Sequence, residues 1–483
     1  MAKEFIVAIE LGSSKVTGIA GKKNLDGSIT VLAVVQENSS SFIRRGVVYN
    51  FDKTMLSLIN IKKRLETLLR TKIQQVYVGI GGQSIIGKKN VIVKDIQPAA
   101  IVTQEMVNEL MDANRNMYYP DNEILDAITS EYKVDSLLQL DPVGIQCERL
   151  EGNFLNIVGR KTFYDSLNKC FSEAKISIAE LYLAPLALAD SVLVESERRS
   201  GCVLVDLGAD TTTVSVYYKN VLRHLSVIPL GSANITRDIA TLQIDEQEAE
   251  KLKLKYAVAY TSNEDVEASD DLIVDQERSI EQNKFIDIVE SRLEEIIRNV
   301  WFQVPSEYYE RMLGGIILTG GGSNMPNIET AFRNHTGIEK IRVAKTVTHT
   351  IDATQNEISI NDGRLNTVLS LLAKGDMNCA GEEIKSDLFN ASEEGSSDSY
   401  EDQSHGVHTQ AGFTGKGIVP TAAEKQRMEE EDRRKREEEE EEKRKEAELK
   451  AEEERRKKRE NSFWNKTLKG LKKFANDAIS ADE

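Results

Sequence analysis

The 483-residue chain contains only four cysteines (Cys147, Cys170, Cys202 and Cys379) and no CxxC pair. Their wide separation disfavours a disulfide scaffold and a structural zinc site. No apolar run reaches the ~18 residues of a membrane span, and residues 1–20 lack the basic-then-apolar layout of a signal peptide. Basic residues number 62 against 79 acidic ones, so the net charge is −17 and we expect no nucleic-acid partner. The sequence predicts a soluble protein made in a reducing cytoplasm.

The charged residues concentrate in the C-terminal part of the chain. Residues 424–460 hold 17 acidic and 15 basic side chains without an apolar stripe, which predicts a solvated helical spacer rather than a coiled coil. Residues 381–423 are rich in Ser, Gly and acidic residues and poor in large apolar ones, which predicts disorder. The globular part is therefore expected over about residues 1–380.

Within residues 1–380, β-branched apolar runs alternate with helical patterns, as in an α/β fold. The clearest runs are FIVAIEL, QVYVGIGG, GCVLVDLG and GGIILTGGG. Helices are predicted at Lys53–Arg70, Thr103–Arg115 (with Thr103 as N-cap), Thr162–Ala174, Asp245–Ala257 and Phe285–Val304.

One local pattern occurs twice, in FIVAIELGSSKVTGIAG near the N-terminus and in CVLVDLGADTTTVSVYY from Cys202. Each copy places an acid and a glycine between two apolar strands: Glu10 and Gly12, then Asp206 and Gly208. The turn of such a β-hairpin offers N–H groups and hydroxyls to phosphates, while the carboxylate can hold Mg²⁺ or its waters.

A third element, ILTGGGSNMPNI at 317–328, is a strand leading into a triple-glycine turn and a helix. Glycine there lets the backbone approach a flat or charged ligand closely. Either hairpin alone could be an ordinary turn. Two copies about 195 residues apart, followed by LTGGGS, instead predict two like domains that close on one nucleotide.

These three motifs resemble those of the actin-like ATPase superfamily. The resemblance implies two ribonuclease-H-like domains around a cleft that holds ATP and Mg²⁺. It places Glu10 and Asp206 at the metal and Gly12 in the first phosphate loop. A helix with Glu250 and Lys253 would pack over the adenosine; the alternative for this pair is a solvated i,i+3 ion pair. The remaining residues implied at the nucleotide are Ser13, Ser14, Lys15, Gly208, Thr211, Thr212, Gly320, Gly321 and Gly322.

Two departures from the superfamily pattern bear on hydrolysis. Glu10 stands where most relatives carry Asp, and the second loop reads LGADTTT where relatives usually read IGGGTT. Ala209 and Asp210 therefore stiffen the loop and add a negative charge. We expect ATP binding with weak or no ATPase activity, and no residue is identified as catalytic.

The strings DPVGIQCERLEGN (141–153), SVIPLGSANITRDIA (226–240) and EAEKLKLKYA (248–257) resemble the bacterial cell-division protein FtsA family. This resemblance covers about 380 residues and implies an inserted α/β subdomain in place of the one in actin. The implied division is as follows: a first nucleotide-binding domain at 1–83, 164–201 and 360–380; the insert at 84–163; a second domain at 202–240 and 307–359; a small subdomain at 241–306; a linker at 381–461; and a terminal helix at 462–480.

The terminal segment Ser462–Ile479 has the pattern of an amphipathic helix at ~100° per residue. An aromatic apolar face opposite a lysine-rich one is typical of an interfacial membrane helix. Docking on the protein's own body or in a partner groove is the alternative. FtsA proteins carry a membrane-targeting helix after a linker, which agrees with the membrane interpretation. The residues concerned are Phe463, Trp464, Leu468, Leu471 and Phe474 on the apolar face, and Lys466, Lys469, Lys472 and Lys473 on the polar face.

The resemblance also implies partners. ATP would close the cleft, closed subunits would polymerise, and many weak helices on one filament would hold the cytoplasmic face of the cell membrane by avidity. The filament would recruit the FtsZ ring through the C-terminal tail of FtsZ, bound at residues 241–306, and then other division proteins. Arg292 falls at a family position implicated in that contact; the alternative is a surface arginine paired with Glu295.

Two other functions use the same cleft. A sugar or acid kinase would need a substrate pocket with a base. A kinase would not need a membrane-binding segment, so this hypothesis leaves residues 462–479 unexplained. A pilus-assembly adaptor with the same insert typically reaches the membrane through a partner and lacks the amphipathic end. Residues 462–479 therefore separate the three hypotheses.

Overall fold

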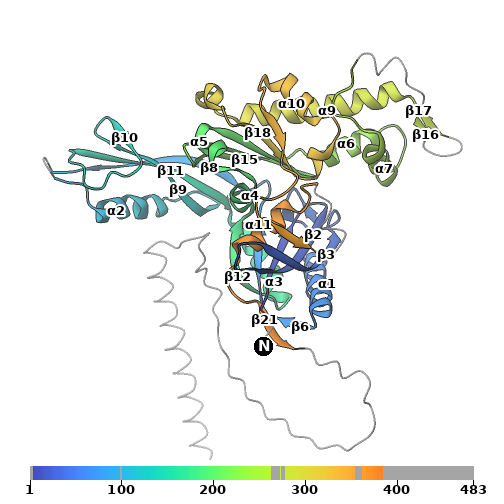
Figure 1. The fold of residues 1–483 in the computed structure, drawn as a ribbon, viewed down its shortest axis with the longest axis horizontal. Coiled ribbons are helices and arrows are strands. Elements are labelled where there is room, and N and C mark those ends of the chain that lie inside the picture. Colours follow the sequence, from blue (N-terminus) through green and yellow to red (C-terminus); the bar gives the residue numbers. More distant parts are fainter. Residues whose placement is uncertain (1–3, 98–99, 263–271, 274–277, 354–361, 384–483) are drawn as a thin grey trace, which may run out of the picture. The chain divides into compact units, whose positions relative to one another are not determined.

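The computed structural model describes residues 4–97, 100–262, 272–273, 278–353 and 362–383. These residues form two α/β domains, each built on one mixed sheet, and an inserted third sheet (Figure 1). The expected linker and terminal helix lie outside the described residues.

The first domain is built on a six-stranded sheet of order β12-β7-β1-β2-β3-β20. β1, β2 and β3 form an antiparallel meander, while β7 and β12 run parallel to β1 and β20 runs parallel to β3. The strands are β1 (Ile6–Leu11), β2 (Lys15–Lys23), β3 (Ile29–Asn38), β7 (Gln75–Ile80), β12 (Ser177–Leu183) and β20 (Ile351–Ala353).

Helices cover both faces of this sheet, and glycines mark where they approach most closely. α1 (Phe51–Leu69) and α3 (Lys161–Glu173) pack together on one face, and α4 (Ala184–Val192) and α11 (Asn366–Lys374) on the other. A Cβ on Gly18 would overlap Ile61 of α1, and one on Gly79 would overlap Leu371 of α11. α1 begins where the Asn50 side chain accepts a hydrogen bond from the Lys53 amide at 3.0 Å, and ends at Arg70 in the left-handed conformation.

The second domain repeats this layout. Its five-stranded sheet has the order β15-β14-β13-β18-β19, with an antiparallel meander followed by two parallel strands. This matches the order β3-β2-β1-β7-β12 strand for strand, as expected for two like domains. The strands are β13 (Cys202–Leu207), β14 (Thr212–Tyr218), β15 (Val221–Ile228), β18 (Gly315–Thr319) and β19 (Ile341–Val343).

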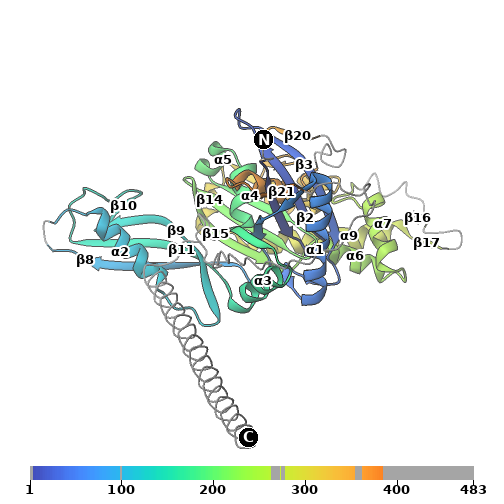
Figure 2. The ribbon, with the colours of Figure 1, turned by 90° about the horizontal axis from the view of Figure 1, so that it is seen from below.

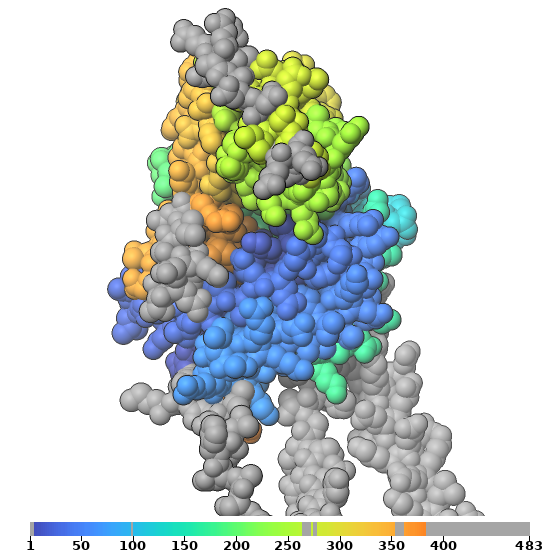
Figure 3. All heavy atoms as spheres, turned by 90° about the vertical axis from the view of Figure 1, so that its right-hand side faces the viewer, coloured from blue at the N-terminus to red at the C-terminus, as the bar shows by residue number. Residues whose placement is uncertain are grey.

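Helices α6 and α7 of the second domain pack on each other, and the long α9 packs against α6 and α10. In the space-filling view, residues of α6 and α7 (light green) lie directly above the first domain (blue) (Figure 3). The helices are α6 (Ser232–Ala240), α7 (Glu246–Tyr256), α9 (Gln282–Gln303) and α10 (Ile328–Thr336).

The insert between β7 and α3 is a four-stranded sheet of order β10-β9-β11-β8 with α2 on one face (Figure 2). Its base lies against β15 of the second domain, where the buried Arg223 pairs with Glu131 at 3.4 Å. The elements are β8 (Ile86–Asp95), α2 (Gln104–Arg115), β9 (Asn122–Val134), β10 (Leu137–Gln139) and β11 (Arg149–Arg160).

Short elements connect these units. β21 pairs with β6 at the edge of the first domain, and β4 pairs with β5 in a tight hairpin. Their bounds are β4 (Ile43–Arg44), β5 (Val47–Val48), β6 (Thr71–Ile73), α5 (Glu195–Ser200), β16 (Leu272–Ile273), β17 (Ser279–Ile280), η1 (Ser306–Arg311), η2 (Gly321–Asn324) and β21 (Ala380–Glu383).

The five predicted helices are present, with ends shifted by at most three residues, and Thr103 accepts a hydrogen bond from the Met106 amide as an N-cap. One boundary differs from the expected division. β20 hydrogen-bonds to β3 in the sheet of the first domain, whereas the division places residues 307–359 with the second. Among the described residues, no helix is both long and apolar enough to cross a membrane.

Candidate nucleotide-binding site

The two predicted hairpins are present, and their turns are closed in the same way. The Gly12 amide donates to the Lys15 carbonyl oxygen, and the Gly208 amide donates to that of Thr211, both at 3.0 Å. A Cβ on either glycine would lie 2.7 Å from the same carbonyl oxygen. Each turn therefore requires glycine for the same steric reason, which extends the duplication from the sheets to the loops.

Glu10 and Asp206, the acids before these turns, lie close enough for the charge of one to affect the other. Burial raises the pKa of Glu10 to about 8, and the negative charge of Asp206 adds to that shift. Burial also raises the pKa of Asp206 to about 6. Neither carboxylate has an ion-pair partner within the described ranges. Two desolvated carboxylates that repel each other are a donor set that fits a hard divalent cation such as Mg²⁺.

The described residues contain no group of three or more His, Cys, Asp or Glu side chains placed to hold a metal. A cation at Glu10 and Asp206 would therefore take its other ligands from water or from phosphate oxygens, as Mg²⁺ commonly does.

The triple-glycine turn after β18 lies against the second hairpin. Gly320 has a φ of +84°, and a Cβ there would overlap the Asp206 carboxylate. A Cβ on Gly322 would lie 3.0 Å from that of Leu207, so Gly322 is needed for packing. Gly321 has only the Arg364 side chain nearby, at 3.8 Å, and is the one of the three with open space beside it. Of the predicted adenosine residues, Gly321 is thus best placed to border a ligand.

The first loop connects to its own domain through its serines. The Ser13 hydroxyl accepts a hydrogen bond from the Gly46 amide at 2.9 Å, and the Ser14 carbonyl accepts one from the Ser39 amide at 3.0 Å. Lys15 is exposed, and its ammonium donates to the Gln36 side chain on β3 at 3.3 Å.

In the second loop, Thr211 is partly exposed but Thr212 is fully buried. The Thr212 hydroxyl donates to the Leu230 carbonyl at 2.8 Å, so it orders the turn before α6. This differs from the expectation that Thr212 faces the phosphates: a strand residue next to the turn points to the opposite side of the sheet from its neighbour.

Glu250 and Lys253 form an ion pair at 2.7 Å, but it is not a solvated one, because Lys253 is only 7% exposed. The ammonium also donates to the Thr236 hydroxyl at 2.8 Å and to the Ser232 carbonyl at 3.1 Å. Thr236 in turn donates to Glu250 at 2.5 Å. Since the Ser232 amide donates to the Gly208 carbonyl at 2.9 Å, this network connects α7 to the second loop through α6.

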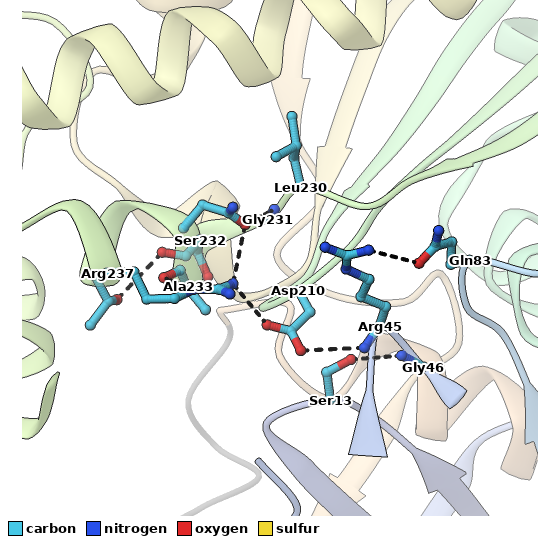
Figure 4. Close-up of polar contacts among 12 residues, drawn as sticks. Ser13, Arg45, Gly46, Gln83, Asp210, Leu230, Gly231, Ser232, Ala233 and Arg237 are labelled. Carbon is cyan, nitrogen blue, oxygen red and sulfur yellow. Dashed lines mark hydrogen bonds and ion pairs between the residues drawn. The ribbon is translucent and has the colours of Figure 1, made fainter. Parts of the chain in front are cut away.

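The sequence interpretation missed a group of residues between the loops (Figure 4). Asp210 accepts hydrogen bonds from the Arg45 amide in the β4–β5 turn and from the Arg237 guanidinium on α6, both at 3.3 Å. The only local signal was the turn-forming string RRG at 44–46. Nothing in that string indicates contact with residue 210.

Arg292 on α9 pairs with Asp238 of α6 and also with Glu295. The expected alternative pair with Glu295 is therefore present, and the pair with Asp238 connects α9 to α6. Its side chain is 26% exposed, so part of it is accessible to a partner. The nine predicted membrane residues between Phe463 and Phe474 lie outside the described residues.

The repeated sheets, the paired loops and the inserted sheet define an actin-like protein. A solved structure described as "PilM-PilN type IV pilus biogenesis complex" has this fold, with a TM-score of 0.53 at 14% identity over 76% of this chain and 97% of that one. The family model "Cell division protein FtsA" matches residues 203–365, and "SHS2 domain inserted in FTSA" matches residues 82–158.

Curated relatives agree with the family models. FtsA of Porphyromonas gingivalis is 29% identical over 367 residues (74% of this chain and 76% of the relative). FtsA of Bacillus subtilis is 30% identical over 336 residues (67% and 75%). The chain belongs to the FtsA family of cell-division proteins.

Proposed function

We propose that this protein binds ATP with Mg²⁺ between its two hairpin loops, polymerises, and anchors the FtsZ ring to the cytoplasmic face of the cell membrane at the division site. The observation that carries the proposal is the pair of identically closed turns, each preceded by a half-buried carboxylate with a raised pKa. Phosphate oxygens would accept from N–H groups of the turns, and Glu10 and Asp206 would hold the cation.

The chain's own residues have defined parts in this proposal. Gly12 and Gly208 keep the turns free of side chains, and Gly321 borders the base or ribose. Lys253 and Glu250 fix α7 to α6, and α6 fixes the second loop. The cation would neutralise phosphate charge when bound. No described residue is assigned as the base for hydrolysis, so the proposal is nucleotide binding with weak or no ATPase activity.

Membrane attachment is proposed for residues 462–480 and FtsZ-tail binding for residues 241–306. For the tail, the partly exposed Arg292 offers a guanidinium that is held in place by Asp238. Recruitment of other division proteins would follow from the assembled filament.

Co-sedimentation with anionic vesicles in the presence and absence of Mg-ATP tests the proposal. The full chain is compared with a chain that ends at Asn461. We expect ATP to increase the sedimented fraction of the full chain, and the shortened chain to remain in the supernatant. Equal sedimentation of the two chains would contradict membrane attachment, and no response to ATP would contradict nucleotide-dependent polymerisation.

A further inference from the structure

The second loop carries an acidic residue where a nucleotide site would not be expected to have one. Asp210 lies in the turn between Gly208 and Thr212. The amides of Ser232 and Ala233, at the start of α6, donate to the Gly208 and Ala209 carbonyl oxygens at 2.9 and 2.8 Å. These bonds fix one side of the loop to α6. The Asp210 side chain, 21% exposed, extends from the loop toward the first domain (Figure 4).

The hydrogen-bond donor on the first domain is held by a rigid turn. Arg45 and Gly46 have φ values of 52° and 74°, the left-handed pair of a type I′ hairpin between β4 and β5. A Cβ on Gly46 would lie 2.5 Å from the Gly82 Cα, so this backbone is packed tightly against residues 81–82. The Arg45 amide donates to Asp210 of the second loop and the next amide, of Gly46, donates to Ser13 of the first loop. One turn therefore bridges both loops.

Arg237 completes the surroundings of the Asp210 carboxylate. Its guanidinium lies 3.3 Å from Asp210 and 3.4 Å from the Asn234 side chain, and its Nε donates to the Ala233 carbonyl at 3.2 Å. The Asp210 carboxylate thus accepts hydrogen bonds from one backbone N–H and one guanidinium between the loops. A phosphate oxygen could accept hydrogen bonds from the same two groups.

We propose that Asp210 competes with the terminal phosphate of a nucleoside triphosphate. The Asp210 carboxylate therefore lowers the affinity of the site for a triphosphate relative to its affinity for a diphosphate. The inference rests on the proposed nucleotide site. Asp210 and an added phosphate would claim the same two donors and repel each other across a short distance in a partly buried site. The Asp210–Arg45 hydrogen bond connects the two domains, and a terminal phosphate would displace it.

The binding experiment measures Kd for Mg-ATP and Mg-ADP with the full chain and with Asp210→Asn, which keeps the shape and removes the charge. We expect the ATP Kd to fall about tenfold and the ADP Kd to fall less than about threefold. Asp112→Asn, a matched charge change on α2 of the insert, should leave both constants unchanged. An unchanged ratio of the two constants in Asp210→Asn, or a weaker affinity for ATP, would overturn the inference.

Hydrogen exchange of the nucleotide-free protein tests the contact separately. In Asp210→Ala, which removes the acceptor, we expect faster exchange of the Arg45 amide and unchanged exchange in α1. Unchanged exchange at Arg45 would overturn the interdomain contact. If the unaltered protein binds neither nucleotide, the proposed function fails as well. If it binds both and only the ratio fails to respond to Asp210→Asn, the proposed function stands and this inference alone is wrong.

Discussion

Gly320 lies so close to Asp206 that a Cβ at position 320 would overlap the carboxylate, and it would also lie 2.7 Å from the Leu207 carbonyl oxygen. The residue that follows β18 is therefore in close contact with Asp206, the acid of the second hairpin. Its φ of +84° is a further reason why only glycine fits. This relationship ties the triple-glycine turn to the candidate cation site.

Gly320→Ala is therefore expected to destabilise the protein by about 2 kcal/mol or more, from left-handed strain plus overlap with Asp206. Thermal unfolding should show a melting temperature lower by roughly 4 °C or more. Gly321→Ala is the matched control, because a Cβ there would lie 3.8 Å from its nearest neighbour, the Arg364 side chain. Equal melting temperatures for the two variants would contradict the assignment of these glycines.

Lys253→Met tests the network between α6 and α7. The substitution removes the buried ammonium and leaves Thr236 and the Ser232 carbonyl without it, while the partly exposed Glu250 regains water. We expect a loss of about 1–2 kcal/mol in the free energy of unfolding, measured by urea titration. Lys251→Met, on an exposed position of the same helix, should change it by less than about 0.5 kcal/mol. If Lys253→Met unfolded at the same urea concentration as the unaltered protein, the network would not contribute to stability and the prediction would be wrong.

The Asp126 carboxyl on β9 is expected to make the stability of the fold depend on pH. Burial raises the pKa of its carboxyl to about 6, partly offset by a hydrogen bond from the Ala127 amide and by Arg115. Because the folded-state pKa lies above the unfolded value near 4, the charged form destabilises the fold, and the cost appears as pH rises from about 4 through 6.

Asp126→Asn should therefore have little effect at pH 4 and should stabilise the protein by about 1–2 kcal/mol at pH 7.5. Melting temperatures of both proteins across this range measure the difference. A difference that shrinks as the pH rises would have the wrong sign and would exclude a raised pKa.

Trp464→Glu tests the proposed membrane helix without shortening the chain. A charge in the centre of the apolar face should release the full chain from anionic vesicles, because interfacial binding depends on buried apolar area. Asn465→Glu adds the same charge on the lysine-rich face of the predicted helix and should weaken binding less. Intact vesicle binding by Trp464→Glu would count against insertion of that face.

The features that could be predicted from the sequence are local ones. Both hairpins, the strand before the triple glycine and the five helices follow from alternation, helical periodicity and turn glycines. The duplication was visible because each copy keeps an acid and a glycine at the same offset, Glu10 with Gly12 and Asp206 with Gly208.

The features that were missed depend on contacts between distant segments. Arg45 and Asp210 are 165 positions apart, and neither local pattern indicates the other. The pairing of β20 with β3 joins residues more than 300 positions apart through three short register pairs. Thr212 was misjudged because its direction depends on the Leu230 carbonyl, which the fold brings to it. Such pairings are set by tertiary packing and leave no periodic trace in the sequence.

The binding of Mg-ATP to the full chain, measured by calorimetry beside Gly208→Asp, tests the central claim most directly. An aspartate at 208 would place its Cβ 2.7 Å from the Thr211 carbonyl oxygen and a second carboxylate in the loop. Asn108→Asp, at an exposed position of α2, controls for the added charge, and Asp206→Asn tests the cation site without steric change. We predict binding by the unaltered protein and Asn108→Asp, at least about tenfold weaker binding by Asp206→Asn, and none by Gly208→Asp. Unaltered affinity in both loop variants, or no binding by the unaltered protein, would contradict a nucleotide held between the two hairpins.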